Sequence, residues 1–307
     1  MKKVLLLLVL LLTANFSACG NEKPAHNDKI KVVATIFPAY DWTREIIGDE
    51  KNIELTLLGG TGVDLHSYQP TAQDIATIAN CDVFIYVGGE SDAWVSDALK
   101  QATNKNLVAV NLLDALGNKV KHEHHEHHEN HDAEIDEHVW LSLRNAQVLC
   151  DAIADVLIKV ESSHEKTFRT NVAAYKEKLA ALDKNYGEVI AAAPVKTILF
   201  GDRFPFRYLC DDYGLKYFAA FSGCSAETEA SFSTIKFLAD KVDELKLPCV
   251  LTIDGSDKKI AETVVANSVT KPQKILTLDS MQATGTDANY LDVMTKNLEV
   301  LREALTK

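Results

Sequence analysis

Residues 143–189 read LRNAQVLCDAIADVLIKVESSHEKTFRTNVAAYKEKLAALDKNYGEV and carry the longest regular pattern in the chain. Their apolar side chains recur every three or four residues, which is the period of a helix that buries one face. The stripe comprises Ala146, Leu149, Cys150, Ile153, Val156, Leu157 and Val160, then Phe168, Val172, Tyr175, Leu179 and Leu182. No proline interrupts it before Pro194, so it predicts one long linking helix, or two in tandem, over residues 143–192.

Short apolar runs alternate with helical patterns on both sides of this segment. Before it we expect strands at Lys31–Phe37, Ile53–Leu58, Asp82–Val87 and Leu107–Asn111, with helices at 39–49, 71–80 and 91–103. After it we expect strands at Thr197–Phe200, Lys216–Phe221, Val250–Asp254 and Lys274–Leu278, with helices at 205–213, 231–246, 256–269 and 289–305.

This alternation predicts the fold class. Strands that are apolar throughout are typical of parallel sheets covered by helices on both faces. The sequence therefore predicts an α/β protein with two lobes, residues 30–142 and 193–307, each a mainly parallel sheet flanked by helices and joined by a long rigid helix. Such sheets bind ligands beyond the carboxyl ends of their strands, which places a ligand in the cleft between the lobes.

The first 18 residues have the layout of a secretory signal peptide. Lys2 and Lys3 precede the apolar run Val4–Leu12, which is shorter than the ~20 residues that a membrane-spanning helix needs. Phe16-Ser-Ala-Cys19 then resembles a bacterial lipobox, whose cysteine becomes the acylated first residue. We expect residues 19–29 to be a lipid-anchored tether at the extracytoplasmic face of the cell membrane, periplasmic in a Gram-negative cell; simple cleavage near Ala18 is the alternative.

The charged residues and the cysteines limit the kinds of ligand and partner that the chain is expected to bind. Asp and Glu number 44 against 32 Lys and Arg, and the net charge of −12 argues against a nucleic-acid partner and suits a cationic ligand. The cysteines after Cys19 are widely spaced and form no C-x-x-C pair, so most are expected to be buried as small apolar residues. They are Cys81, Cys150, Cys210, Cys224 and Cys249.

Residues 117–137 interrupt the pattern as a hydrophilic loop and contain HEHHEHHENH at positions 122–131. Imidazole is the commonest protein ligand for zinc, copper and nickel, so this composition predicts an accessory metal-binding loop. An inert solvated linker is the alternative. The loop histidines are His122, His124, His125, His127, His128 and His131.

Two further histidines stand at the boundaries of predicted elements, where side chains can converge on a cleft. His66 follows the strand that ends near Leu58, and His138 lies between the loop and the long helix. A lone histidine is more often structural, but zinc needs about four N, S or O ligands and polar residues follow three later strands. These candidates are Asp202 and Arg203, Cys224 and Glu227, and Asp254.

The residues around these histidines resemble a known family. GVDLHSYQPTAQD at 62–74 resembles the G-x-D-P-H-x-Y-x-P-T-x-x-D motif of the metal-specific, cluster A-I substrate-binding proteins of ABC importers. Glu137-His138-Val-Trp-Leu with Asn145-Ala146 resembles their D-x-H-x-W-L-x-P-x-N-A motif. Tyr213-Gly-Leu and GCSAETEAS at 223–231 resemble their Y-G-L and G-I-S-P-E-x-E-P-S segments.

The resemblance implies a zinc-binding lipoprotein with a metal held between two lobes, which docks onto an ABC permease and its ATPase. His66 and His138 match family ligands, and Asp254 matches the position of the last acidic ligand. Zinc members place a third histidine before an A-F-x-Y segment, where this chain has Arg203. Arginine stays protonated and cannot bind a metal.

Another residue must therefore complete the site. Cys224 is the first choice because a thiolate is a good zinc ligand, although it could instead be a buried replacement for the family's isoleucine. Asp202 and Glu227 are the runners-up. Arg203 would then pair with Asp254 or Glu227 and orient that carboxylate.

Together with the resemblance, these residues predict a monomeric extracytoplasmic binding protein, not an enzyme, that captures Zn²⁺ and delivers it to an ABC permease. Mn²⁺ becomes an alternative if Asp202 or Glu227 replaces Cys224, since manganese sites favour oxygen. A secreted zinc hydrolase is a second alternative, but the chain has no H-E-x-x-H and no G-x-S-x-G. A metal-buffering lipoprotein or adhesin would need only the histidine loop, whereas His66 and His138 indicate a defined site.

Overall fold

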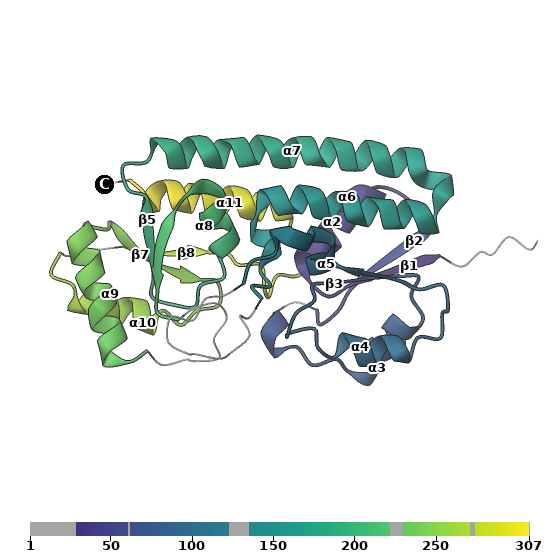
Figure 1. Ribbon diagram of the computed structural model, residues 1–307, viewed down its shortest axis with the longest axis horizontal. Coiled ribbons are helices and arrows are strands. Elements are labelled where there is room, and N and C mark those ends of the chain that lie inside the picture. The colour runs from purple at the N-terminus through teal and green to yellow at the C-terminus, as the bar shows by residue number, and fades with distance from the viewer. Residues whose placement is uncertain (1–28, 61, 123–134, 222–229, 271–273, 307) are drawn as a thin grey trace, which may run out of the picture.

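The computed structural model describes residues 29–60, 62–122, 135–221, 230–270 and 274–306. Two lobes lie side by side beneath one long helix, α7, which runs along both of them (Figure 1). Each lobe contains a four-stranded parallel sheet. The predicted fold class is therefore confirmed.

The N-terminal lobe is built on strands β1 (Ile30–Ala34), β2 (Ile53–Leu57), β3 (Val83–Tyr86) and β4 (Val108–Asn111), in the order β2-β1-β3-β4. Its helices are α2 (Phe37–Ile47), α3 (Ala72–Ala79), α4 (Val95–Lys100) and α5 (Leu112–Leu116). Val33 and Phe84 pack on the side of α3 and α4, while Val32 and Ile85 face the main core, as alternation along strands requires. The sheet is thus covered on both faces.

The C-terminal lobe repeats this plan with β5 (Thr197–Phe200), β6 (Lys216–Ala219), β7 (Cys249–Ile253) and β8 (Lys274–Leu278), in the order β6-β5-β7-β8. Its helices are α8 (Arg207–Tyr213), α9 (Phe232–Leu245), α10 (Lys259–Asn267) and α11 (Tyr290–Ala304). The strands within each sheet are parallel, so their carboxyl ends lie at the same edge of that sheet. The loops that carry the candidate site residues begin at this edge.

The long helical segment consists of two helices, α6 (Leu143–Val160) and α7 (Glu165–Ala192), separated by a 3-10 turn at Ser162–His164. They fold back on each other rather than continuing in tandem: Arg144 pairs with Asp183, and Asp151 pairs with Lys176 (Figure 1). The Glu161 side chain accepts the Ser163 N–H, which competes with helical hydrogen bonding at the turn. Of these two helices, α7 is the one that runs along both lobes (Figure 1).

Several predicted boundaries shift by a few residues. β1 ends at Ala34 because Pro38, in the first turn of α2, starts a helix where the sequence suggested more strand. The helix predicted over 91–103 contracts to Val95–Lys100, and the five-residue α5 was missed because it is too short to show a period. In the described part of the chain, no helix is long and apolar enough to cross a membrane.

Four of the five cysteines fulfil their prediction. Cys81, Cys150, Cys210 and Cys249 are buried with free thiols. Burial raises the pKa of the Cys81 and Cys249 thiols to about 12, so both stay protonated at neutral pH. Cys224 lies outside the described residues.

Tyr290 joins the lobes at the start of α11. Its hydroxyl donates to the Trp140 carbonyl at 2.6 Å, and its backbone N–H donates to the buried Asp41 carboxylate in α2 at 2.7 Å. Its ring also packs edge-on against Trp42. One continuous apolar core consequently runs from the N-terminal sheet through α6, α7 and α11 to the C-terminal sheet.

Tyr290→Phe is expected to lower the free energy of unfolding by about 1–2 kcal/mol, because it removes a buried hydrogen bond and leaves the Trp140 carbonyl without its donor. Urea unfolding measures the change. Tyr217→Phe is the control, since Tyr217 is 38% exposed, and it should change stability by less than about 0.5 kcal/mol. Equal effects of the two substitutions would contradict this role for Tyr290.

Candidate metal centre

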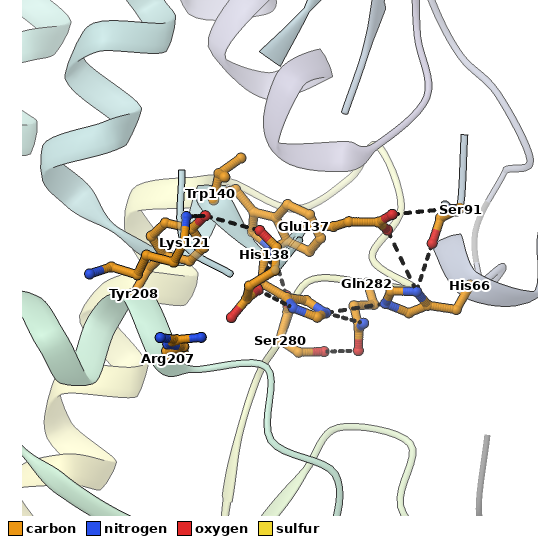
Figure 2. Close-up of polar contacts among 12 residues, drawn as sticks. His66, Ser91, Lys121, Glu137, His138, Trp140, Arg207, Tyr208, Ser280 and Gln282 are labelled. Carbon is orange, nitrogen blue, oxygen red and sulfur yellow. Dashed lines mark hydrogen bonds and ion pairs between the residues drawn. The ribbon is translucent and has the colours of Figure 1, made fainter. Parts of the chain in front are cut away.

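His66 and His138 meet between the lobes although 72 positions separate them in the chain (Figure 2). His66 lies on a 3-10 turn, Leu65–Ser67, and His138 directly precedes another, Val139–Leu141. Their Nε2 atoms are 3.1 Å apart. Two nitrogens bound to one tetrahedral zinc at about 2.0–2.1 Å would be separated by about 3.3 Å, so the pair is close to ligand spacing.

His138 is held from behind by Asp136. Its Nδ1 lies 2.8 Å from Asp136 Oδ1, and its backbone N–H donates to the same oxygen at 2.9 Å. The side chains are 2% and 1% exposed. Since a carboxylate only accepts, Nδ1 carries a proton and Nε2 is the nitrogen turned toward His66, which is the usual support for a metal-binding histidine.

The C-terminal lobe fixes this segment as well. Tyr208 of α8 donates its hydroxyl proton to the Asp136 carbonyl at 2.9 Å, and the same hydroxyl accepts the Lys121 N–H (Figure 2). Trp140 packs edge-on against the His138 ring and donates Nε1–H to the Ser280 carbonyl at 2.8 Å. The position of His138 therefore depends on both lobes.

His66 is supported by residues at the ends of other elements. Its Nδ1 lies 2.8 Å from Ser91 Oγ and 3.8 Å from Glu137 Oε2, and its backbone N–H donates to Asp64 Oδ1 at 2.9 Å. Burial, and then the neighbouring His138, lower the pKa of His66 to about 4. His66 is therefore neutral at neutral pH, which is the state in which imidazole binds a metal.

Gln282 also reaches this centre, and the sequence reasoning missed it. Its Nε2 lies 3.0 Å from His138 Nε2, and its Oε1 accepts the Ser280 hydroxyl at 3.1 Å (Figure 2). Gln282 is 6% exposed and follows β8 by four residues. The strand-end rule that selected Asp202 and Asp254 would have found it if applied to this fourth strand.

Asp254 follows β7 and connects to the histidines indirectly. Its Oδ1 accepts the backbone N–H and the hydroxyl of Ser280 at 2.6 and 2.7 Å. Ser280 in turn contacts Gln282, which contacts His138. The predicted acidic residue thus lies in the same polar network, with Ser280 as its nearest partner.

Asp202 and Arg203 are engaged in hydrogen bonds and an ion pair that hold neighbouring segments together. Asp202 accepts the Arg203 N–H at 2.8 Å and the Ile253 N–H at 3.4 Å, so it ties the end of β5 to β7. Arg203 pairs with Asp64 of the N-terminal lobe at 3.4 Å, a partner different from the Asp254 or Glu227 suggested by the sequence. Arg203 therefore lies beside the turn that carries His66.

The remaining predicted site residues lie outside the described part of the chain. They are Cys19, Cys224, Glu227, His124, His125, His127, His128 and His131. His122 is described, and it forms an isolated antiparallel bridge with Ile135, so the two ends of the histidine loop lie together next to Asp136. Within the described ranges, no three His, Cys, Asp or Glu side chains form a complete set of metal ligands.

Several known proteins are similar to this chain in sequence and in fold. The zinc-binding lipoprotein AdcA of Streptococcus pneumoniae (TIGR4) is 34% identical over 310 residues, which cover 99% of this chain and 61% of that protein. The high-affinity zinc uptake system protein ZnuA of Bacillus subtilis (strain 168) is 30% identical, with 94% and 93% covered. The Zn(II)-bound ZnuA-like domain of S. pneumoniae AdcA superposes with a TM-score of 0.73 at 29% identity, covering 91% of this chain and 100% of that domain.

The family assignment rests on more than these relatives. The chain spans only 61% of the length of AdcA, so the full activity of that protein is not transferred by similarity alone. The match to the family model, however, runs over residues 32–304 and includes both lobes, α7 and both histidines. The chain therefore belongs to the ZnuA family, described as zinc-uptake complex component A, periplasmic.

Proposed function

We propose that this protein captures Zn²⁺ in the interlobe cleft and delivers it to an ABC permease and its ATPase. The observation that carries the proposal is the His66–His138 pair, with Nε2 atoms 3.1 Å apart and both Nδ1 atoms held by partners. The zinc names of the relatives and of the family support the same cargo.

Zinc fits this centre better than manganese. Imidazole nitrogen suits zinc, while manganese sites lean to carboxylate, carbonyl and water. The low pKa of His66 keeps that ring available without the release of a proton at neutral pH. The relatives and the family are named for zinc binding and zinc uptake, which supports Zn²⁺ as cargo and the chain as a binding protein rather than an enzyme.

Other side chains complete the coordination. Asp202 already accepts the backbone N–H groups of Arg203 and Ile253, so it would lose these contacts on turning to a metal. Cys224 therefore remains the first choice, with Glu227 as runner-up and Asp254 as the acidic ligand. Gln282 turns its NH₂ group to His138 and its amide oxygen to Ser280, so it could bind a metal through oxygen only if the amide turned over.

The N-terminal residues have the pattern of a secreted lipoprotein. We propose residues 1–18 as signal peptide and Cys19–Lys29 as a lipid-anchored tether that holds a monomer at the extracytoplasmic face of the membrane. Residues 30–142 and 193–307 are the lobes, 143–192 the linking segment, and the histidine loop an accessory collector of metal.

His66→Ala is expected to weaken zinc binding by roughly 100-fold or more. A zinc site supplies about 10–16 kcal/mol, so one of four ligands accounts for about 3 kcal/mol. Competition against a chelating dye measures the affinity. His164→Ala is the control, because His164 pairs with Glu50 on the surface. Unchanged affinity in the His66 variant would remove this pair from the site.

Cys224→Ser is expected to lower zinc affinity and to reduce selectivity for zinc over manganese, because a thiolate ligand is replaced by a weaker hydroxyl. Titration with both metals measures each effect, and Glu227→Gln is run in parallel. If Cys224→Ser leaves affinity and selectivity unaltered while Glu227→Gln lowers them, the ligand is Glu227.

Deletion of residues 123–134 should leave one tight zinc site and abolish only weaker binding, because His66 and His138 lie outside the deleted segment. The His122–Ile135 bridge places the two ends of this segment side by side, so a two-residue Gly-Gly turn joins them in the deletion variant. Calorimetry separates tight from weak sites. Loss of all binding would instead favour a metal-buffering role for the loop.

A further inference from the structure

The segment between β8 and α11 comes from the C-terminal lobe but is hydrogen-bonded to the N-terminal lobe. It comprises residues 280–289, which we call the crossing segment. The Ala283 carbonyl accepts the Gly62 N–H at 2.9 Å, and the Ser280 carbonyl accepts the Trp140 indole N–H at 2.8 Å. Gly62 lies four positions before one site histidine, and Trp140 lies two positions after the other. The crossing segment therefore contacts both parts of the chain that carry the metal-binding pair.

Arg44 of α2 holds the far end of the crossing segment. Its Nη1 donates to the Thr286 carbonyl at 2.8 Å, and its Nη2 donates to the Ala288 carbonyl at 2.7 Å. Arg44 also pairs with Asp41, whose carboxylate is fully buried and accepts the Tyr290 N–H at 2.7 Å. Helix α2 of the N-terminal lobe thus fixes the end of the crossing segment through three backbone groups that lie 242 to 249 positions away in the sequence.

The near end of the crossing segment is fixed to the C-terminal lobe and carries a strained residue. Asp254 accepts the N–H and the hydroxyl of Ser280, and the next residue, Met281, has φ +59°. A residue with a Cβ rarely adopts this conformation, so the surrounding contacts have to hold it. Met281 stands between Ser280 and Gln282, which lie beside His138 (Figure 2). Release of the far end would let Met281 relax and would redirect both of its neighbours.

We propose that Arg44 is a positioning residue of the metal centre; the proposal rests on the zinc function proposed above. In the described part of the chain, its hydrogen bonds and ion pair go to Asp41, Thr286 and Ala288, so it acts on the two histidines only through the crossing segment. By holding that segment on α2, Arg44 keeps its contacts with both histidine-bearing parts of the chain in place. The family motifs around the histidines do not include Arg44, so the resemblance assigns it no role.

Arg44→Gln tests the proposal, because glutamine is shorter and has one NH₂ group where arginine has a fork that spans two carbonyls. Zinc affinity, measured by competition against a chelating dye, is expected to fall roughly tenfold, the lower end of the loss seen for groups that support metal ligands. In ¹H–¹⁵N NMR spectra of the metal-free protein, the Trp140 indole signal should move upfield in ¹H, because its hydrogen bond to the Ser280 carbonyl lengthens.

Three comparisons separate this role from a general loss of stability. The Trp94 indole signal should stay in place in Arg44→Gln, because Trp94 packs on the α3 and α4 side of the N-terminal sheet. Val33→Ala removes apolar contacts on that same side, so it should lower stability while zinc affinity and the Trp140 signal stay unchanged. Arg169→Gln is the matched control, because Arg169 is 58% exposed and pairs within α7, and it should alter neither measurement.

Arg44→Lys provides a second variant in case Arg44→Gln does not fold. The ammonium group keeps the charge beside Asp41 but lacks the planar fork that reaches Thr286 and Ala288 together. Both measurements should therefore change in the same direction as in Arg44→Gln and by a smaller amount. Wild-type values for both in Arg44→Lys would overturn the proposal.

The two measurements decide the proposal separately. If zinc affinity falls while the Trp140 signal stays, the loss does not pass through the crossing segment and the proposal is overturned. If the signal moves while affinity equals that of the wild type, the crossing segment does not position the site, and the proposal is overturned as well. The NMR measurement needs no zinc. A moved Trp140 signal in a protein that binds no zinc would therefore overturn the proposed function while confirming that Arg44 positions the crossing segment.

Discussion

Two imidazole nitrogens lie 3.1 Å apart between the lobes, and the rest of the molecule holds them at that spacing. If both rings were protonated, they would repel each other, and burial makes a charge on His66 still less favourable. The protein therefore has to hold the two rings at ligand spacing without protonating both of them. It does so by giving each Nδ1 a fixed partner, Asp136 for His138, and Ser91 with Glu137 for His66.

The arrangement of the two lobes also keeps the His66 and His138 rings at this spacing. His66 comes from the N-terminal lobe, while His138 is fixed by Tyr208 and, through Trp140, by the Ser280 carbonyl of the C-terminal lobe. Independent movement of the lobes would change the distance between the rings. The shared core, the Tyr290 contacts and the single helix α7 resist such movement, because separating the lobes would expose buried apolar surface and break buried hydrogen bonds.

The polar network around the pair has different chemistry on its two sides. The N-terminal side holds the carboxylates of Asp64, Asp136 and Glu137, which fix backbone or ring N–H groups. The C-terminal side holds Arg203 against Asp64, and the chain of contacts from Asp254 through Ser280 to Gln282. Arg203 stands where the family resemblance places a third histidine, and it forms an ion pair with Asp64 of the N-terminal lobe. From the C-terminal lobe, the neutral amide of Gln282 contacts His138.

The sequence by itself determined the two parallel-sheet lobes, the long helical segment and the choice of His66 and His138. The lobes and the helical segment follow from apolar runs and helical period, which are readable along the chain. The two histidines follow from their places at element boundaries together with the family motifs around them. The antiparallel turn between α6 and α7, the Arg203–Asp64 pair, Gln282 behind His138 and Glu137 behind His66 were decided only by the tertiary structure. Each is a contact between side chains that lie tens to more than a hundred residues apart in the sequence. Local patterns along the chain do not say which of these distant residues come together in space.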